Sequence, residues 1–468
     1  MQLPIVTSAP LVAQHAPIFA HLFENRCQYR HFEHYLTGLM VLENKSLTNI
    51  ARCVLASADK TNLSRFFSEA PWVAEQVNDT RIAYMVRVTA PHRHTKHTAA
   101  LLLDDTLCEH VGSLFEHIAR HYNHATDTYP LAHNPITTHL LCGAVRFPVD
   151  LREYRRYEEL TRWEEFIHDR FPEQEIPRDR PGRTRLHQRV DDILLEDPEF
   201  EALHQQFRTK IALAVELLQQ AVQRQLPFDV VLFDAWFLAP EVIAVVTAAH
   251  KDWISILKPN RNLETHSFVL RDARGAPIPL AGPHIQVKDL VPLIPASAYR
   301  RVTLDAQTYW TFTLTVRVPS LGKVRIVISF ANAELTGNYV VLITNRTDWN
   351  AHRIIATYLL RWPIETFYQD SKQGLGLDEY RMRSAEAIQK HWCLVFVAYS
   401  FLHLDCLPLS PVEALAMPIK TIGQAARQQA QLLIQALICL AHEQLSQGTS
   451  IAEVFTYLFA KQGIVMTT

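Results

Sequence analysis

Little in this sequence assigns it to a specialised class of protein. The seven cysteines are scattered, and no Cys-x-x-Cys pair indicates a zinc site or a redox dithiol. We therefore expect reduced, mostly buried thiols in a cytoplasmic protein. The most apolar stretch, Cys393 to Leu404, is too short to span a bilayer, and the N-terminus lacks the basic start and long apolar run of a signal peptide. Internal repeats and low-complexity tracts are absent as well.

Neither sign of charge dominates, because 46 Lys and Arg residues are balanced by 48 Asp and Glu residues. A near-neutral total can conceal a basic face, so nucleic-acid binding is not excluded. Between Lys251 and Asn350 the chain holds twelve Lys and Arg against seven Asp and Glu, a modest excess that favours an anionic partner. With 468 residues, 48% of them hydrophobic, the chain is predicted to form two to four globular domains or one domain with large insertions.

An aspartate pair follows the first continuous apolar run. Residues 98–103 predict a buried central strand that ends at Asp104 and Asp105. A buried acid at a strand end is costly unless it binds something positive. Because side chains on a strand alternate in direction, only one of the two can point into a site. The capping-box pattern Thr106 to Glu109 then predicts an amphipathic helix through Ile118.

Four histidines follow at spacings of seven, four and three residues, which would place them along one face of that helix: His110, His117, His121 and His124. A zinc site is one interpretation of this spacing. A polar stripe beside the apolar one is the other, and we favour it because no cysteine or glutamate completes a zinc-protease motif.

A second aspartate also ends an apolar strand. An amphipathic helix is predicted over Thr209–Gln225 and a strand over Asp229–Asp234. A helix at Pro240–His250 and a strand at Trp253–Lys258 complete a strand-helix-strand unit that should be parallel and right-handed. Apolar residues between Ile136 and Phe147 predict neighbouring strands of the same sheet.

Two stretches interrupt this pattern. Residues from 150 to about 207 are charged and proline-bearing, which predicts an exposed insert with some helix and a usually solvated surface. From 258 to 345 the texture is β-rich: Tyr309–Val318 and Lys323–Phe330 predict a hairpin, and Tyr339–Thr344 adds a strand. The block is too long for a loop in a compact domain, so we interpret it as an inserted β subdomain.

The first 95 residues are predicted to be mostly helical. Lys45 to Arg52 begins one short helix with a capping serine, and a second from Lys60 to Phe67 offers Lys60, Asn62 and Arg65 on its polar face. This pair suits a helix-turn-helix that enters a DNA groove, and it equally suits a helical bundle packed on the main domain.

The third candidate acid lies in the stretch from Tyr358 to Lys372. Pro363 predicts a break at Arg361 and Trp362 and a new helix from Pro363 onward. On it Glu365 and Lys372 are two turns apart, with Tyr368 and Gln369 between them on the same face, and Gly374 and Gly376 end the helix. For any lone Glu and Lys a solvated ion pair is the ordinary interpretation.

Long helices are predicted at Ser384–Leu404 and Lys420–Gln444.

Together the three acids suggest a metal centre. Carboxylates from two strand ends and a helix make an oxygen-rich site suited to Mg²⁺ or Mn²⁺. Two such ions can activate the attacking oxygen and stabilise the leaving oxygen in phosphodiester displacement. Basic groups beside Glu365 would meet phosphate oxygens.

The string Tyr358-x-x-Arg361-x-x-x-Glu365-x-x-x-x-x-x-Lys372 resembles the Y-R-E-K signature of the DDE transposases of bacterial insertion sequences. The residues around Asp104 resemble the first Asp motif of that family, and those around Asp234 the second. The resemblance covers about 95–400, with a looser match at 45–72. It implies an α/β fold: an RNase H-like core interrupted by a β-rich insertion subdomain, with helical N-terminal and C-terminal regions.

The implied organisation has five parts. A helical region that is a candidate for DNA binding occupies 1–95, and the first part of the core occupies 96–258 with the charged insert at about 150–207. The β-rich insertion spans 259–345, the Y-R-E-K helix completes the core at 346–400, and a helical region follows at 401–468.

The resemblance also implies residue roles. Asp104, Asp234 and Glu365 would be the catalytic triad that binds two Mg²⁺ or Mn²⁺ ions, and the family pattern favours Asp104 over Asp105. Residues expected to contact DNA are Tyr358, Arg361, Lys372, Trp362, Lys60 and Arg65. Trp362 would stack near a flipped base, with core packing as the alternative, and Trp310 is a weaker candidate for stacking.

The implied function is a transposase that cuts DNA at mobile-element ends and joins the freed 3′ hydroxyl to target DNA. Its partners would be double-stranded DNA, namely terminal inverted repeats and target, and a second copy of the chain in a DNA-bound homodimer, in a bacterial cytoplasm near the nucleoid and with no membrane. The alternatives are a DNA-binding repressor or end-binding protein derived from a transposase, which does not cleave, or another RNase H-like nuclease such as a resolvase.

Overall fold

The computed structural model describes residues 3–56, 59–93, 96–407 and 421–462, and its chain divides into two compact units. Unit 1 comprises Met1–Ala100, His139–Asp150 and Arg361–Thr468, and unit 2 comprises Leu101–Thr138 and Leu151–Leu360. The predicted boundary at residue 95 and the predicted helix start at Lys420 lie outside the described residues.

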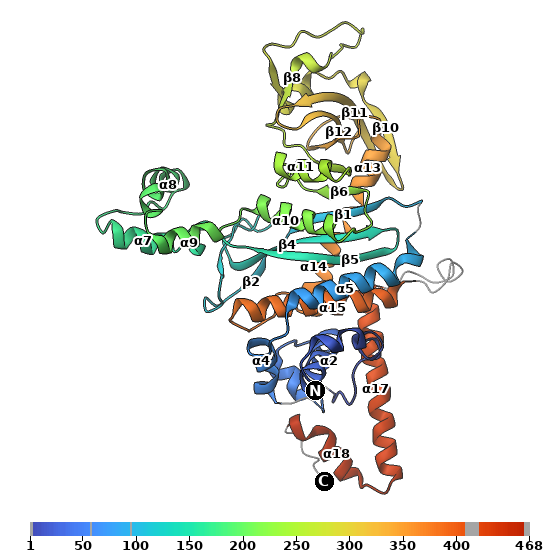
Figure 1. Cartoon of the computed structure of the whole chain (residues 1–468). Helices are drawn as coiled ribbons and strands as arrows, with labels where there is room; N and C mark the ends of the chain where they lie inside the picture. The colour runs from blue at the N-terminus through green and yellow to red at the C-terminus, as the bar shows by residue number, and fades with distance from the viewer. Residues whose placement is uncertain (1–2, 57–58, 94–95, 408–420, 463–468) are drawn as a thin grey trace. The chain divides into compact units, whose positions relative to one another are not determined.

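Among the described residues, a mixed sheet of eleven strands runs in the order β10-β11-β12-β13-β7-β6-β1-β4-β2, with β3 and β5 also paired to β4 (Figure 1). The central strands β1 and β6 are apolar and buried, as continuous apolar runs predict for strands covered on both faces. The strand bounds are β1 Ala99–Asp105, β2 Cys108–His110, β3 Ala119–Arg120, β4 Leu131–Cys142, β5 Val145–Tyr154, β6 Val230–Phe233, β7 Asp252–Ile256, β10 Arg300–Leu304, β11 Gln307–Val318, β12 Gly322–Phe330 and β13 Tyr339–Thr344.

The predicted strand-helix-strand unit is present in unit 2. Helix α11 (Pro240–Ala248) connects β6 to β7, and these two strands pair in parallel. Helix α10 (Lys210–Gln223) precedes β6 and packs against α11. The hydroxyl of Thr209 accepts a hydrogen bond from the backbone N–H of Ala212 and so caps the start of α10.

The β-rich block extends the same sheet. Strands β11 and β12 form the predicted hairpin, with Val318 opposite Gly322 at the turn, and β13 pairs antiparallel with β7 through Ile343 opposite Ser255. Pairing with β13 satisfies backbone groups that β7 would otherwise expose on this side. The block is therefore continuous with the sheet, apart from the small two-stranded β8 (Asn262–Glu264) and β9 (His284–Gln286).

The helix predicted after Thr106 is wrong. Residues 108–110 form β2 and residues 119–120 form β3, and both strands pair with β4, where Cys108 lies opposite His133. Long-range pairing with β4 replaces the local helical pattern, and Val111 and Leu114 are left exposed. The four histidines consequently share no helical face, which removes the basis for the zinc interpretation.

Four helices make up the charged insert, which extends away from the sheet of unit 2 (Figure 1). They are α6 (Tyr157–Leu160), α7 (Trp163–Arg170), α8 (Arg180–Leu194) and α9 (Pro198–Gln206). The insert has a core of its own, formed by Trp163, Ile167, Leu186, Val190, Leu194 and Phe200.

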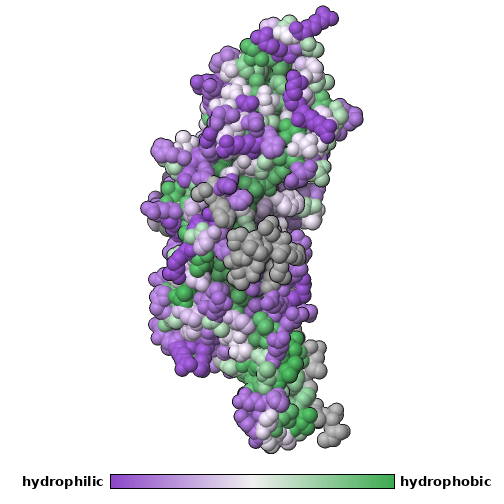
Figure 2. All heavy atoms as spheres, turned by 90° about the vertical axis from the view of Figure 1, so that its right-hand side faces the viewer, coloured by the Kyte–Doolittle hydropathy of each residue, from purple (hydrophilic) through white to green (hydrophobic). Residues whose placement is uncertain are grey.

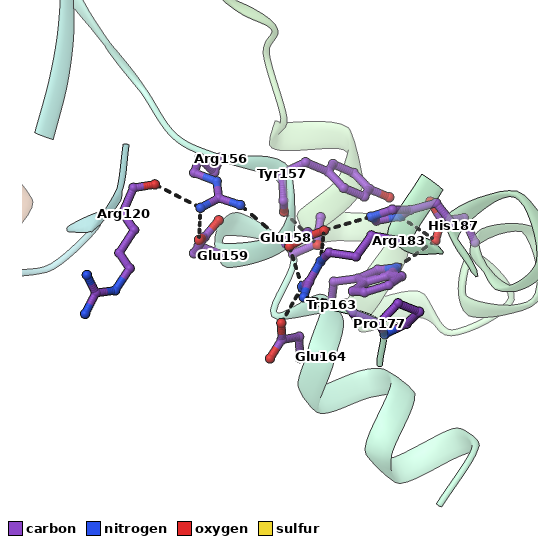
Figure 3. A network of polar contacts seen from close by, with 12 residues as sticks. Arg120, Arg156, Tyr157, Glu158, Glu159, Trp163, Glu164, Pro177, Arg183 and His187 are labelled. Carbon is purple, nitrogen blue, oxygen red and sulfur yellow. Dashed lines mark hydrogen bonds and ion pairs between the residues drawn. The ribbon is translucent and has the colours of Figure 1, made fainter. Parts of the chain in front are cut away.

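A polar network fastens these helices together (Figure 3). The guanidinium of Arg183 donates to both carboxylate oxygens of Glu158, at 2.9 and 2.6 Å, and also pairs with Glu164. His187 lies between Glu158 and Asp191 and stacks on the ring of Trp163 at a centroid distance of 3.9 Å. Many charges of this segment therefore pair with one another between helices rather than face solvent alone.

Helix α15 (Ala385–Cys406) is the centre of unit 1. Almost its whole length is buried, and it packs against α1 (Pro10–His15), α2 (Arg26–Val41), α4 (Lys60–Ser68), α5 (Ala74–Val88), α14 (Pro363–Leu375) and α17 (Ile422–Ser446). The fully buried Arg81 of α5 donates to Ser400 of α15 at 3.0 Å and to the carbonyl oxygens of Pro148 and Val149 at 2.7 Å. These bonds satisfy a charge that would otherwise be costly to bury.

The two short N-terminal helices pack into this unit. Ser46 caps α3 (Leu47–Cys53), and α4 buries Phe66 and Phe67. Lys390 of α15, itself buried, donates to the backbone carbonyl of Ala70 just after α4, at 2.8 Å. On the opposite face of α4, Lys60 and Arg65 are exposed. The pair is thus part of a helical bundle and still presents its basic face to solvent.

The C-terminal helices α17 and α18 (Ile451–Phe459) expose apolar side chains. Ile434, Ile438 and Leu445 lie on the outer surface of α17, and Figure 2, which faces this helix, shows apolar residues gathered along its lower part.

No helix in the described part of the chain is long and apolar enough to cross a membrane.

Gly376 ends α14 in the left-handed conformation, with φ of +71°. A Cβ at this position would lie 2.7 Å from Cγ of Lys45. Lys45 is buried, and its ammonium group donates to the carbonyl oxygens of Leu39 and Leu42 at the end of α2. Burial lowers the pKa of Lys45 to about 8. The prediction that Gly376 ends the helix is confirmed, whereas Gly374 lies inside α14.

We predict opposite effects for two alanine substitutions in this turn. Gly376→Ala should lower the free energy of unfolding by about 1–2 kcal/mol or more, because alanine disfavours positive φ and its Cβ would meet Lys45. Gly374→Ala, a helical position with open space around it, should be neutral or stabilising by up to about 1 kcal/mol. Urea denaturation of both variants measures the difference, and equal effects would contradict this account of the turn.

Candidate active site

Two of the candidate acids lie at the ends of neighbouring strands in unit 2. Asp104 is the penultimate residue of β1, and Asp234 directly follows β6. These strands are adjacent in the sheet. Both acids are half-buried.

A lysine shows that the two strand ends lie at the same edge. Nζ of Lys210, the first residue of α10, is 2.8 Å from Oδ2 of Asp105 and 5.7 Å from the ring centroid of Trp236. Asp105 is the last residue of β1, and Trp236 is two residues beyond Asp234. One ammonium group therefore touches the segment that ends each strand, which brings Asp104 and Asp234 to one edge of the sheet.

The structure distinguishes the two adjacent aspartates. The carboxylate of Asp105 accepts hydrogen bonds from Lys210 and from the side-chain amide of Asn134, both at 2.8 Å. Oδ1 of Asp104 accepts a hydrogen bond from the backbone N–H of Asp105 at 2.9 Å. Alternation along the strand points the two side chains in different directions, and the choice of Asp104 for a metal site stays a prediction.

Local hydrogen bonds also hold Asp234. Its Oδ1 accepts from the backbone N–H of Trp236 at 2.9 Å, and its carbonyl oxygen accepts from the hydroxyl of Ser255 on β7 at 3.0 Å. Two carboxylates at one edge supply the oxygen donors that Mg²⁺ and Mn²⁺ prefer, so the residues of this edge fit such an ion.

The third candidate acid is in unit 1. α13 (Ala351–Leu359) ends before Arg361, and α14 begins at Pro363, as the position of Pro363 predicts. Glu365 lies in the first turn of α14, with 43% of its side chain exposed, and its Oε1 is 2.9 Å from Nη2 of Arg361. The side chain of Arg361 is only 16% exposed, so this ion pair is partly shielded from solvent.

The neighbouring predicted residues differ in exposure. Trp362 is 69% exposed, which excludes core packing within its unit. Lys372 is half-buried and Gln369 exposed, but Tyr368 is only 7% exposed and packs against His139 and Phe367. The expectation that Tyr368 shares the polar face of α14 is wrong, because its aromatic ring contributes to the apolar side of the helix. Tyr358 on α13 and Trp310 on β11 are half-buried.

The candidate residues are therefore divided between the two units. Asp104, Asp234 and Tyr358 belong to unit 2, and Arg361, Trp362, Glu365 and Lys372 belong to unit 1 with Lys60 and Arg65. Among the residues with described positions, no three His, Cys, Asp or Glu side chains form a group that could hold a metal ion. The placement of Glu365 beside the two aspartates stays a prediction.

Fold and site define the class: a mixed α/β protein whose sheet carries two acids at one edge. The family described as DDE superfamily endonuclease matches residues 18–313, more than half of the chain, and the protein belongs to this family. The match includes Asp104 and Asp234 and ends before Glu365.

A cryo-EM structure of the piggyBac transposase synaptic complex with hairpin DNA is similar with a TM-score of 0.43 and 8% sequence identity, over 95% of this chain and 77% of that one. No curated protein matches the sequence.

Three residues of this edge were not predicted from the sequence: Lys210, Asn134 and Trp236. The only available signal was for Trp236, which stands two residues after a predicted strand-end acid. Lys210 and Asn134 are 105 and 29 residues from Asp105 in the chain, so no local pattern connects them to it.

We predict measurable coupling between Lys210 and Asp105. Lys210→Met should lower the free energy of unfolding by roughly 1–3 kcal/mol, because it leaves a partly buried carboxylate without its cation. In a double-mutant cycle with Asp105→Asn, the coupling energy should be about 1 kcal/mol or more. Additive effects in denaturant unfolding would show that the pair does not hold this edge together.

Burial of His139 beside Phe367 of α14 predicts a dependence of stability on pH. Burial, assisted by the charge of Arg81, lowers the pKa of His139 from 6.5 to about 3. Above pH 6.5 the imidazole is neutral in both the folded and the unfolded chain, so protonation does not reduce the free energy of unfolding. Below pH 6.5 the unfolded chain binds the proton first, and the free energy of unfolding falls. His139→Leu should therefore reduce the loss of stability between pH 6 and 4.5 by up to about 1.4 kcal/mol per pH unit. Urea unfolding of both proteins across this pH range measures the difference. If the free energy of unfolding falls equally steeply with pH in His139→Leu and in the parent protein, His139 is not the group responsible.

Proposed function

We propose that this DDE superfamily endonuclease is a transposase that cuts DNA at the ends of a mobile element and joins the freed 3′ hydroxyl to target DNA. The observation that supports the proposal is that Asp104 and Asp234 stand at the ends of two neighbouring strands, β1 and β6, of one sheet. The Y-R-E-K string from Tyr358 to Lys372 supports the same assignment, because it supplies a third acid with basic neighbours in the order that insertion-sequence transposases have.

In this proposal Asp104, Asp234 and Glu365 hold two Mg²⁺ or Mn²⁺ ions. When bound, such ions lower the pKa of an attacking water or hydroxyl and neutralise charge on the leaving oxygen. The three carboxylates orient the ions, and the hydrogen bond from the N–H of Trp236 orients the carboxylate of Asp234. Asp105 acts only through Lys210 and Asn134, as a positioning residue for the end of β1.

The basic and aromatic groups near Glu365 would hold DNA. Arg361 and Lys372 would meet phosphates near the scissile bond, and Tyr358 would contact the same backbone. The exposure of Trp362 supports stacking on a flipped base. The exposed Lys60 and Arg65 of α4 are suited to more distant phosphates.

Several features of the proposal rest on the resemblance. They are the RNase H-like character of the core, the role of the β10–β13 block as the insertion of this group, and a homodimer that pairs terminal inverted repeats in a bacterial nucleoid. The parallel β6-α11-β7 unit beside β1 supports the first of these.

The decisive test is metal-dependent cleavage of labelled element-end DNA. Asp104→Asn, Asp234→Asn and Glu365→Gln should each lower the cleavage rate by at least about 100-fold, because replacement even of groups that only orient metal ligands costs 10- to 100-fold. Undiminished cleavage by any of the three would remove that residue from the site. Binding of end DNA without cleavage by the parent protein would instead favour an end-binding protein, and cleavage of branched DNA without strand transfer would favour a resolvase-like nuclease.

Asp105→Asn is the matched control for Asp104→Asn. We expect it to lower the cleavage rate by at most about 10- to 100-fold, less than Asp104→Asn, since it keeps the shape of the side chain and removes the ion pair with Lys210. Loss of cleavage in Asp105→Asn with retention in Asp104→Asn would reverse the two roles.

A further inference from the structure

Three cations gather on one face of the β11–β12 hairpin, near its turn: Arg317, Lys323 and Arg325. In the register of the hairpin Arg317 lies directly opposite Lys323, and Arg325 lies opposite Thr315. Because side chains alternate between the two faces of a strand, these four residues share one face. The other face holds buried valines: Val316, Val318 and Val324. The cations therefore lie on the solvent-facing side of the hairpin end.

The pairing of Arg317 with Lys323 is unfavourable by itself. Like charges directly opposite one another on antiparallel strands destabilise a sheet, because their Cβ atoms are only about 4.5–5.5 Å apart. Both side chains are exposed, and in the described part of the chain no carboxylate forms an ion pair with either of them. A ligand of negative charge would relieve this repulsion.

Arg325 carries a charge that only neutral groups satisfy. Its guanidinium donates to the carbonyl oxygen of Thr347 at 2.8 Å and to the hydroxyl of Thr313 at 3.3 Å, and its Nε is buried without a hydrogen-bond partner. Asp348, the acid next to Thr347 in the chain, pairs with Arg346 instead, at 2.8 Å. A half-buried cation without an opposite charge is costly, so Arg325 adds to the demand for an anion on this face.

The strand register locates this face relative to the acids of unit 2. Arg325 is level with Thr344 of β13, and Thr344 is level with Ile254 of β7. Ile254 is in turn level with Leu232 of β6, two residues before Asp234. The face is thus three strands, about 14 Å, to the side of β6, and Figure 1 shows the hairpin on the side of β6 away from β1. A ligand here lies beside the acids rather than between them.

Spacing and chemistry together select a polyanion. Lys323 and Arg325 are two residues apart on one strand, about 6.6 Å, and Arg317 lies beside them. Separate cations on an open face suit several anionic groups in succession, and a guanidinium matches phosphate oxygens with two parallel hydrogen bonds. The backbone of duplex DNA presents such a succession, with one charge per about 1.7 Å of its axis. The excess of Lys and Arg between Lys251 and Asn350 has the same sign.

We propose that this face of the β11–β12 hairpin binds the phosphate backbone of duplex DNA beside the stretch that is cut, through Arg317, Lys323 and Arg325. The biological role rests on the proposed function, which supplies DNA as the partner, and none of the three residues belongs to the set assigned to DNA above. Contacts to phosphates do not depend on base sequence, so the face would hold any duplex that runs past the side of the sheet.

The test is the salt dependence of binding, measured by fluorescence anisotropy with a short labelled duplex of arbitrary sequence in EDTA. Arg317→Gln, Lys323→Gln and Arg325→Gln should each lower the slope of log K against log salt by about 0.9, the value for one lost phosphate contact. Arg325→Lys keeps the charge and should keep the slope. Arg301→Gln is the matched control, because Arg301 is exposed on β10 opposite Trp310, on the other face of the sheet. Unchanged slopes in the three glutamine variants, or an equal loss in Arg301→Gln, would overturn the proposal.

Urea unfolding separates lost binding from lost folding. Because Arg317→Gln and Lys323→Gln each remove one of two opposed like charges, the urea midpoint of the free protein should stay unchanged or rise. A lower midpoint in both variants would show that the two side chains maintain the hairpin, and it would overturn the assignment of their pairing to DNA.

An acidic protein segment is the other polyanion that could use this face. Labelled polyglutamate should bind more weakly than the duplex in the parent protein, because it lacks the closely spaced phosphates. If Arg317→Gln and Lys323→Gln weaken polyglutamate binding and leave the duplex slope unchanged, the face docks a protein and the DNA proposal is rejected.

Failure of this proposal is distinguishable from failure of the proposed function. Duplex binding with the expected slope changes, in a protein that does not cut end DNA, would support the hairpin face and reject the transposase assignment. Metal-dependent cutting of end DNA, by a protein whose hairpin variants keep the parent slope, would reject the hairpin face and support the transposase assignment.

Discussion

The ion pair between Lys210 and Asp105 is the interaction on which this edge of the sheet depends. It joins the end of β1 to the start of α10, and the same ammonium group contacts Trp236 beyond β6. Because the pair engages Asp105, the adjacent Asp104 is directed to the other side of the strand. The same lysine forms part of the wall of a neighbouring cavity.

In unit 1, which contains α14 with Glu365, buried cations are held by backbone groups. Its buried cations are satisfied by backbone carbonyl oxygens: those of Lys45 lie at the end of α2, that of Lys390 lies after α4, and those of Arg81 lie in β5. Such bonds compensate for desolvation only when the geometry is complete, which makes the surrounding packing specific. Lys45 also passes Gly376, where only glycine leaves room for it, and this contact sets the end of α14.

Strong local signals in the sequence predicted local structure well. The break before Pro363 and the turn between β11 and β12 follow from residue types within a few positions, and the parallel pairing of β6 and β7 follows from the strand-helix-strand order. The helix expected after Thr106 failed because β4 offers hydrogen bonds to residues 108–110 that outweigh the local helical pattern. Tyr368 was misplaced because periodicity defines a helical face but does not say which neighbours cover it.

By itself the sequence determined the order and setting of the three acids: two at the ends of apolar strands, and one on a helix begun by a proline between Arg361 and Lys372. Its local chemistry sufficed because strand ends and helix starts depend on neighbouring residues. Only the tertiary structure decided that Asp105 is paired, that Trp236 is open between two lysines, and that both belong to one edge. Those facts arise from contacts between residues as many as 105 positions apart, and such contacts depend on how the strands and helices pack rather than on any pattern along the chain.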